Sequence, residues 1–191
     1  MLNENVYKKK IVPPEHQELR LPKIMWLYTD HALKGEKMLE QVMGHYLILV
    51  GNQSGWEVRV VNSWSAYNHL TPDTQKKITD TMQRMYLEEK VHDLYKLGLL
   101  IDNGGVVISP TEFLPIENFH WIEKLFMSTQ EELETFKATK VLLIQRASHL
   151  NAEKEVLDFF IAAAKGSILI RDTFNEVCQS ITTGRFKFFE V

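Results

Sequence analysis

The pattern of apolar and polar positions predicts a strand, a helix and a second strand in the first third of the chain. Lys23–Tyr28 reads as a short buried strand, and Trp56–Val61 alternates as a second one. Between them an amphipathic helix is expected, because apolar residues recur there at helical spacing, among them Met38, Val42, Met43, Tyr46 and Leu49. Strand, helix and strand in this order form a βαβ unit, which favours an α/β fold with a parallel sheet.

Helical spacing dominates the middle of the chain. Thr71-Pro72 is a typical helix start, because proline fits the first helical position, and apolar residues then recur at Ile78, Met82, Met85 and Tyr86. We expect helix to continue, with a break near Lys90, as far as Asn103-Gly104-Gly105. Val106–Ile108 is then a third short strand, which Pro110 ends.

The last third of the chain predicts a mixture of helices and one strand. We expect a short helix over residues 118–124 and a fourth strand over Lys140–Ile144. Val156–Ala164 and Ile168–Ile181 are predicted to be two closing helices.

The two ends of the chain differ in pattern from the domain between them. Residues 1–21 are polar and aperiodic and predict an extended tail, held by the domain surface or by a partner. Residues 22–181 form the predicted α/β domain. Within 182–191, Phe186 and Phe188 alternate with basic residues and Phe189 follows, which predicts a strand that adds to a sheet edge. We therefore expect other protein subunits to bind at both ends.

Composition and charge exclude several classes of partner. The 191 residues, 45% of them hydrophobic, suit one globular domain. Lys and Arg number 22 against 25 for Asp and Glu, and this net charge of −3 argues against nucleic acid. The longest apolar runs, Tyr46–Val50 and Phe159–Ala164, fall short of the roughly 20 residues of a membrane helix. The first residues lack the apolar core of a secretory signal, so we expect the cytoplasm or an organelle interior such as the mitochondrion.

Common metal and catalytic motifs are missing from the sequence. The seven histidines contain no pair spaced three to five residues apart, so no helical zinc site is predicted. The glycines of Gly51–Gly55 lack the Lys-Ser/Thr of a phosphate-binding loop. The single cysteine, Cys178, can form no internal disulfide, and we expect it to be a small apolar side chain in a helix.

The most informative stretch is Val91–Thr111, in which a helix carrying an acid and a base runs into Gly-Gly and then into an apolar strand. This pattern resembles the sugar-nucleotide glycosyltransferases of the capsular polysaccharide synthesis type. Their motif reads Ser-Asp-x-x-Arg, Gly-Gly, an apolar strand and Asp-x-Asp. Leu21–Trp26 and Gly55–Val61 resemble the first two strands of that family, and Phe159–Ser167 resembles a later segment, so the resemblance covers about residues 21–181.

The resemblance implies a GT-A-type fold, a Rossmann-like sandwich with a mostly parallel central sheet and flanking helices. It also implies a nucleotide-sugar donor, whose diphosphate is held by manganese or magnesium on the Asp-x-Asp carboxylates. Asp93 matches the helix acid near the donor, Lys96 replaces the arginine and His92 replaces the serine. Trp26, Tyr28, Gly104 and Gly105 would complete a vestigial nucleotide-sugar site.

The metal ligands of the family are absent from the matching positions. Ser109-Pro110-Thr111 stands in place of Asp-x-Asp, and neutral hydroxyls are poor anchors for magnesium or manganese. Asp102 and Glu112 are the nearest carboxylates that could act as displaced ligands, although strand alternation turns Glu112 away from Thr111.

Two main functions follow from this resemblance, and a small-ligand binding module that keeps a nucleotide pocket without turnover is a third. The first is a degenerate glycosyltransferase-like domain, without cofactor, that acts as a structural or interaction subunit of a protein assembly. The second is an active transferase with an atypical or metal-independent site, in which Asp93, Lys96 and Glu112 are the remaining catalytic candidates.

Overall fold

The computed structural model describes residues 21–29, 44–48, 55–84, 91–110, 122, 141–146 and 155–183, and for 141–146 and 155–159 it describes the backbone alone. The chain forms an α/β fold. Its elements are β1 (Ile24–Tyr28), β2 (Glu57–Val61), α3 (Ser63–Tyr67), α4 (Pro72–Met82), α5 (Val91–Asp102), β3 (Gly105–Ile108), β4 (Val141–Arg146), β5 (Glu155–Ala163) and α8 (Ile168–Thr183).

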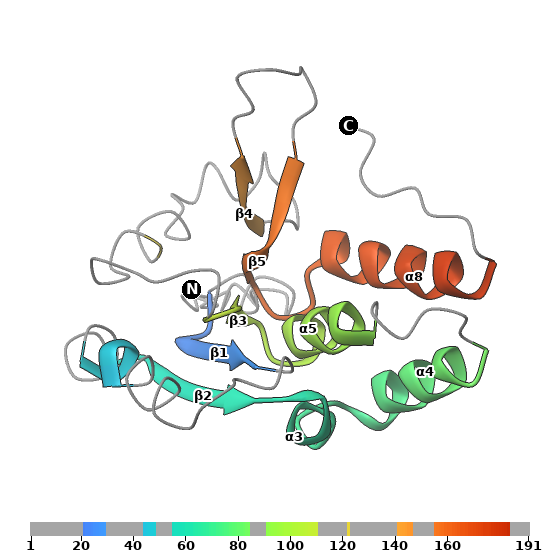
Figure 1. Ribbon diagram of the computed structural model, residues 1–191, viewed down its shortest axis with the longest axis horizontal. Coiled ribbons are helices and arrows are strands. Elements are labelled where there is room, and N and C mark those ends of the chain that lie inside the picture. Colours follow the sequence, from blue (N-terminus) through green and yellow to red (C-terminus); the bar gives the residue numbers. More distant parts are fainter. Residues whose placement is uncertain are drawn as a thin grey trace, which may run out of the picture.

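The described strands form one five-stranded sheet in the order β2-β1-β3-β5-β4 (Figure 1). β1 pairs in parallel with β2 on one side and with β3 on the other. β5 runs antiparallel to both β3 and β4. The sheet is therefore mixed, and the expectation of a mostly parallel sheet holds for β1, β2 and β3 and fails at β5.

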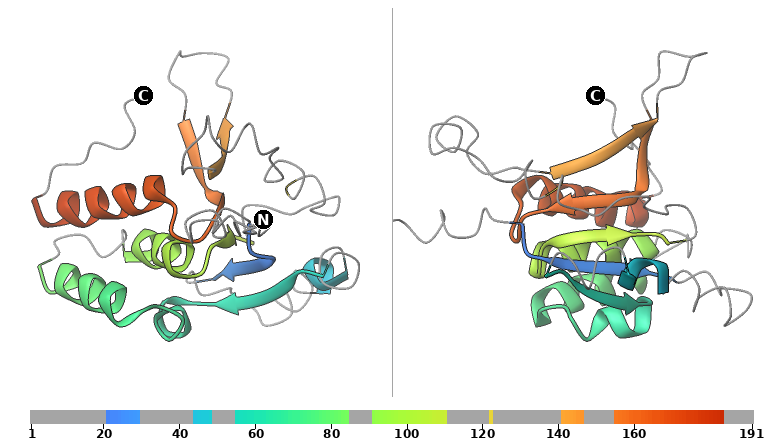
Figure 2. Two further views of the ribbon diagram at one scale, coloured as in Figure 1. Left: turned by 180° about the vertical axis from the view of Figure 1, so that it is seen from behind. Right: turned by 90° about the vertical axis from the view of Figure 1, so that its left-hand side faces the viewer.

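Alternate residues of the central strands pack into two separate apolar clusters, one on each face of the sheet. Trp26, Tyr28 and Val107 belong to the cluster that includes buried residues of α5 and α8. These two helices lie side by side in all views (Figures 1 and 2). On the opposite face lie Met25, Leu27, Val106, Ile108, Phe160 and Ala162 of the sheet, together with Tyr46, Trp56 and Ile122. Side chains of β1 are thus buried on both faces, as is usual for a central parallel strand.

Local contacts determine where α4 begins and how closely it approaches α5. Thr71 caps α4 by accepting a hydrogen bond from the Thr74 amide, and Pro72 follows at the first helical position. Gly98 of α5 lets α4 come close, because a Cβ there would lie 3.1 Å from Thr74 Cγ2 and 3.2 Å from Leu70 Cδ2.

Most elements predicted from the sequence are present. Strands near 23–28, 56–61, 106–108 and 140–144 are confirmed, as are the helices that begin at residue 72 and at residue 168 and the helix that ends before the glycine pair. Cys178 lies buried in α8, as expected. Within the described residues, no helix is both long and apolar enough to cross a membrane.

The predicted helix over Val156–Ala164 is wrong, because this segment is strand β5. A short apolar run has no periodicity that distinguishes a strand from a buried helix. Here pairing with β3 and β4 makes the segment a strand. The helix α3 was not expected. It is only five residues long, and a capping box starts it, in which Asn62 and Ser65 each bond the backbone amide of the other.

Several predictions lie outside the described residues. Of the expected helix around Met38–Leu49, residues 44–48 are described and are helical. Of the helix expected over 118–124, Ile122 alone is described. Both predicted tails, apart from residues 21 and 182–183, and the positions of Thr111 and Glu112 also lie outside.

Candidate functional site

Polar side chains gather where the parallel strands end. Tyr28 is the last residue of β1, Ser63 begins α3 directly after β2, and His92 lies in the first turn of α5. The chain crosses from β2 on one side of β1 to β3 on the other. In α/β sheets, ligands bind at the carboxyl ends of strands beside such a crossing. We call Tyr28, Ser63, His92, Asp93 and Lys96 the carboxyl-end cluster.

The hydroxyl groups of the cluster surround the imidazole of His92. Tyr28 Oη lies 2.9 Å from Ser63 Oγ and 3.3 Å from His92 Nδ1. Ser63 Oγ lies 3.5 Å from the same nitrogen, and the Tyr28 and His92 rings meet edge to face at 6.1 Å. Hydroxyls can donate or accept, so this triangle satisfies either tautomer of the imidazole and fixes the orientation of its ring.

Lys96 brings a positive charge into the cluster. Its Nζ lies 3.9 Å from Asp93 Oδ1, three residues earlier on α5, and 5.8 Å from the centre of the Tyr28 ring. The side chains of Lys96 and Asp93 are only 10% and 17% exposed. A charge buried to this extent is costly unless an opposite charge accompanies it. Asp93 and the face of Tyr28 supply that compensation for Lys96, and the first turn of α5 favours the carboxylate.

The end of β3 presents a different chemistry from that of the Asp-x-Asp motif. Ser109 follows β3 and is buried, and Pro110 comes next. A serine hydroxyl beside a proline does not fit a hard divalent metal, which prefers carboxylate oxygens. Among the described residues, no three His, Cys, Asp or Glu side chains lie close enough to hold a metal ion.

Asp102 is engaged in joining two helices. One of its carboxylate oxygens accepts hydrogen bonds from the Thr71 amide at 2.7 Å and from the Thr71 hydroxyl at 3.0 Å. The other oxygen accepts from the Thr74 hydroxyl at 3.1 Å. The last residue of α5 thus caps the start of α4, and these contacts, rather than a metal, account for Asp102.

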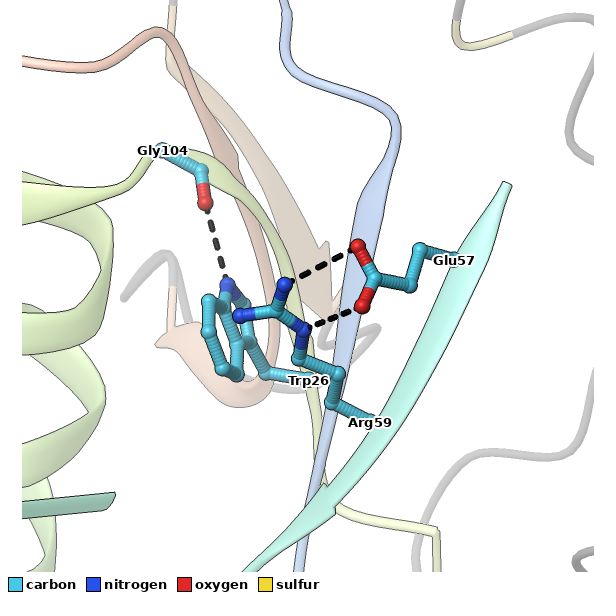
Figure 3. A network of polar contacts seen from close by, with 4 residues as sticks. All are labelled: Trp26, Glu57, Arg59 and Gly104. Carbon is cyan, nitrogen blue, oxygen red and sulfur yellow. Dashed lines mark hydrogen bonds and ion pairs between the residues drawn. The ribbon is translucent and has the colours of Figure 1, made fainter. Parts of the chain in front are cut away.

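Trp26, Gly104 and Gly105 lie away from the carboxyl-end cluster, and their contacts are those of packing. Trp26 is fully buried in mid-strand, and its Nε1 donates a hydrogen bond to the Gly104 carbonyl at 3.1 Å (Figure 3). Both glycines have positive φ, at 70° and 100°. A Cβ on Gly105 would lie 2.3 Å from the Ile24 carbonyl oxygen. The glycine pair therefore lets the start of β3 lie directly against the start of β1.

A second polar group lies over the Trp26 ring. Arg59 of β2 places its guanidinium carbon 5.0 Å from the centre of the Trp26 ring. The His69 ring contacts the Trp26 ring edge to face, with 5.1 Å between the two ring centres. Arg59 also donates two hydrogen bonds, of 2.7 and 3.0 Å, to the carboxylate of Glu57. These hydrogen bonds lower the pKa of Glu57 below its usual value, so the side chain is ionised at neutral pH.

The predicted site residues thus separate into two groups. Tyr28, Asp93 and Lys96 lie together, whereas Trp26 and the glycine pair lie elsewhere. Ser63 was missed by sequence reasoning. Its position immediately after a parallel strand was the available signal, because such positions line the carboxyl edge of the sheet.

Comparison with known proteins gives this chain no family. Neither the protein-family models nor the curated proteins contain a match to it.

Proposed function

We propose that this chain is a glycosyltransferase-like domain that has lost metal-dependent transfer and acts as a structural subunit of a protein assembly. One observation carries the proposal. At the place where the resemblance expects a donor to bind, the ionic groups satisfy each other, since Lys96 pairs with Asp93 and lies over Tyr28. Side chains already neutralised within the fold offer less to a charged ligand.

The chemistry at the end of β3 supports the same proposal. The position that matches the first aspartate of Asp-x-Asp is Ser109, which is 8% exposed and precedes a proline. The diphosphate of a nucleotide sugar leaves with developing negative charge, which a metal on carboxylates normally neutralises. A serine hydroxyl carries no charge with which to hold that metal.

The order of elements supports the glycosyltransferase-like part of the proposal. β1 and β2 coincide with the segments that resemble the first two strands of the family. α5, the glycine pair and β3 coincide with its central motif. The exposed Trp64, 85% accessible on α3, is compatible with a role in binding protein, because tryptophan is enriched where interfaces are strongest.

An active transferase is the second candidate, and the position of the cluster favours it. The cluster lies at the carboxyl ends of parallel strands, where α/β enzymes bind their ligands. Transfer without a metal requires a cation at the departing diphosphate, and Lys96 is the cation of this cluster. In this case Lys96 must leave Asp93 when the donor binds.

Calorimetry with nucleoside diphosphates and nucleotide sugars, with and without manganese, separates the two candidates. We expect no heat of binding under either condition. Manganese-dependent binding in the micromolar range would overturn the proposal. Manganese-independent binding that Lys96→Met abolishes would establish the second candidate.

A restoration variant tests the origin of the site. Ser109→Asp combined with Thr111→Asp returns both carboxylates of the motif, and Ser109→Asn with Thr111→Asn is the matched uncharged control. We expect manganese-dependent nucleotide binding in the aspartate pair alone. If both variants fold, as circular dichroism reports, and neither binds, the chain has no vestigial donor site.

The assembly role is tested at the predicted tails. We expect deletion of residues 1–20 or 184–191 to release the protein from its native complex, as seen by size-exclusion chromatography of cell extract. The isolated variants should keep the unfolding midpoint of the full chain. Association that survives both deletions would contradict this role for the tails.

A further inference from the structure

The outer edge of β2 ends the sheet within the described residues. Its pairing with β1 begins with the Glu57 amide donating to the Lys23 carbonyl at 2.8 Å and ends with the Thr29 amide donating to the Val61 carbonyl at 2.9 Å. In a parallel ladder, alternate residues bond the neighbouring strand. The amides and carbonyls of Val58 and Val60, between these ends, therefore point away from β1.

The side chains along this edge are accessible. Val60 is 40% exposed, and the side chains of Glu57 and Arg59 are 56% and 32% exposed. Glu57 and Arg59 lie on one face of the strand, beside Trp26 of β1 (Figure 3). β2 contains neither proline nor lysine, residues that often protect an edge strand from pairing.

The charges of one β2 strand are complementary to those of a second β2 strand that runs in the opposite direction. Glu57, Val58 and Arg59 read acid, apolar, base in one direction and base, apolar, acid in the other. We propose that two copies of this chain pair through β2 in antiparallel orientation, with Val58 opposite Val58 of the second copy. Glu57 of each copy then lies opposite Arg59 of the other, on the same face of a continuous sheet.

Hydrogen bonding and symmetry agree with this register. Residues with outward amides must oppose one another across an antiparallel pair, and Val58 meets Val58 while Val60 meets Trp56. The arrangement is related by a two-fold axis, so it closes as a dimer. The existing Arg59–Glu57 ion pair, with contacts of 2.7 and 3.0 Å, becomes part of a group of four charges of alternating sign.

Two other arrangements of the same strands are disfavoured by charge. Centring the pair on Arg59 keeps outward amides opposed but places Arg59 against Arg59. Parallel pairing in register places Glu57 beside Glu57 and has no closing two-fold axis. Like charges directly opposite on a sheet are destabilising.

The inference does not depend on the proposed loss of transferase activity, and a charge-exchange experiment tests it. Glu57→Arg gives a strand with two bases, and Arg59→Glu gives a strand with two acids. Each variant alone opposes like charges across the pair, whereas a mixture of the two opposes unlike charges twice. We expect the mixed dimer to have a dissociation constant at least about tenfold below that of either variant alone.

The wild-type chain should sediment as a dimer over about 1–100 μM in analytical ultracentrifugation. Val60→Pro removes one amide that points away from β1 and leaves the hydrogen bonds between β2 and β1 in place. We expect this variant to be a monomer with unchanged circular dichroism. Val60→Thr keeps the amide and should remain dimeric. A monomeric wild type, a dimer that persists in Val60→Pro, or variants that gain nothing from mixing would each overturn the proposal.

Discussion

Lys96 is a cation held almost entirely inside the protein. Its charge is balanced by Asp93 at 3.9 Å and by the Tyr28 ring. Removing one member of a buried ion pair leaves the other charge uncompensated, which costs more than the pair itself contributes. Asp93 and Lys96 lie on the same helix, so it is the contact of Lys96 with the Tyr28 ring that joins α5 to the end of β1, and Asp93 balances the charge in that contact.

We expect Asp93→Asn to lower the free energy of unfolding by about 1–3 kcal/mol, because Lys96 then stays buried beside a neutral amide. Urea denaturation followed by circular dichroism gives this value. The double variant Asp93→Asn with Lys96→Met should recover part of the loss. Equal stability of Asp93→Asn and wild type would show that the ion pair is unimportant.

Gly105 carries a second residue-scale prediction. Its φ of 100° and the Ile24 carbonyl 2.3 Å from the position of a Cβ leave no room for a side chain. We expect Gly105→Ala to cost about 3 kcal/mol or more in urea unfolding. Gly44, where a Cβ meets nothing within 4 Å, is the control, and Gly44→Ala should change stability little. Equal losses at both positions would refute the packing role.

Only some residues of the carboxyl-end cluster could be predicted from the sequence alone. Tyr28, Asp93 and Lys96 could be grouped because a motif resemblance aligned them. Gly104 and Gly105 belong to the same motif, but the structure places them away from this cluster, at the start of β3. A close approach of two strands requires glycine just as a close approach of a ligand does, so the sequence could not distinguish the two roles. Ser63 lacks any motif, and only the end of β2 brings it to Tyr28.

At the scale of elements, Asp102 links the end of α5 to the start of α4. Each helix leaves backbone groups unpaired at its ends. Here the carboxylate of Asp102 accepts hydrogen bonds from the Thr71 amide, at the start of α4, and from the hydroxyls of Thr71 and Thr74. The two helices are therefore held together by capping as well as by the close approach at Gly98.

We expect Asp102→Ala to lower stability by about 1–2 kcal/mol, because the Thr71 amide and two threonine hydroxyls lose their acceptor. Thermal unfolding followed by circular dichroism measures the change. Asp80→Ala, on the exposed surface of α4, removes a charge without a capping contact and should have a small effect. If the two variants melt alike, the cap contributes nothing.

Elements with clear sequence signals were predictable, and the one serious error has a physical cause. β1 and β3 are short buried strands, β2 alternates charged with apolar residues, and α4 begins at a proline. The segment of β5 contains phenylalanine, isoleucine and two alanines, which suit a strand and a helix alike. Pairing with β3 and β4 makes this segment a strand. The local sequence pattern cannot predict such pairing, because the partner strands are distant in sequence.

At the scale of the whole molecule, Cys178 reports on the integrity of the helical face of the sheet. It is the single cysteine of the chain and lies in the cluster that joins α5, α8 and β1. Burial raises the pKa of its thiol above the usual value and outweighs a hydrogen bond with the Thr81 side chain, which lowers it. Less thiolate is therefore present at neutral pH than in the unfolded chain.

We expect alkylation of Cys178 by iodoacetamide at pH 7.5 to be slower by about a hundredfold or more in the native protein than in urea. Mass spectrometry of the intact chain follows the reaction. Asp93→Asn should speed native labelling if loss of the ion pair loosens α5. Rapid labelling of the native wild type would mean that α8 separates readily from the sheet.

An irregularity in the pairing of β4 with β5 divides β5, the longest of the described strands, into two parts. Leu143 pairs with Ile161, but the next residue, Ile144, pairs with Leu157. Beyond this irregularity β4 and β5 pair only with each other among the described strands, and they extend away from α5 and α8 (Figures 1 and 2). A reporter domain inserted between Arg146 and Glu155 would therefore sit at the end of an arm, remote from both apolar clusters and from β2. This insertion site therefore suits imaging of the assembly that we propose, because it leaves β2 and both apolar clusters undisturbed.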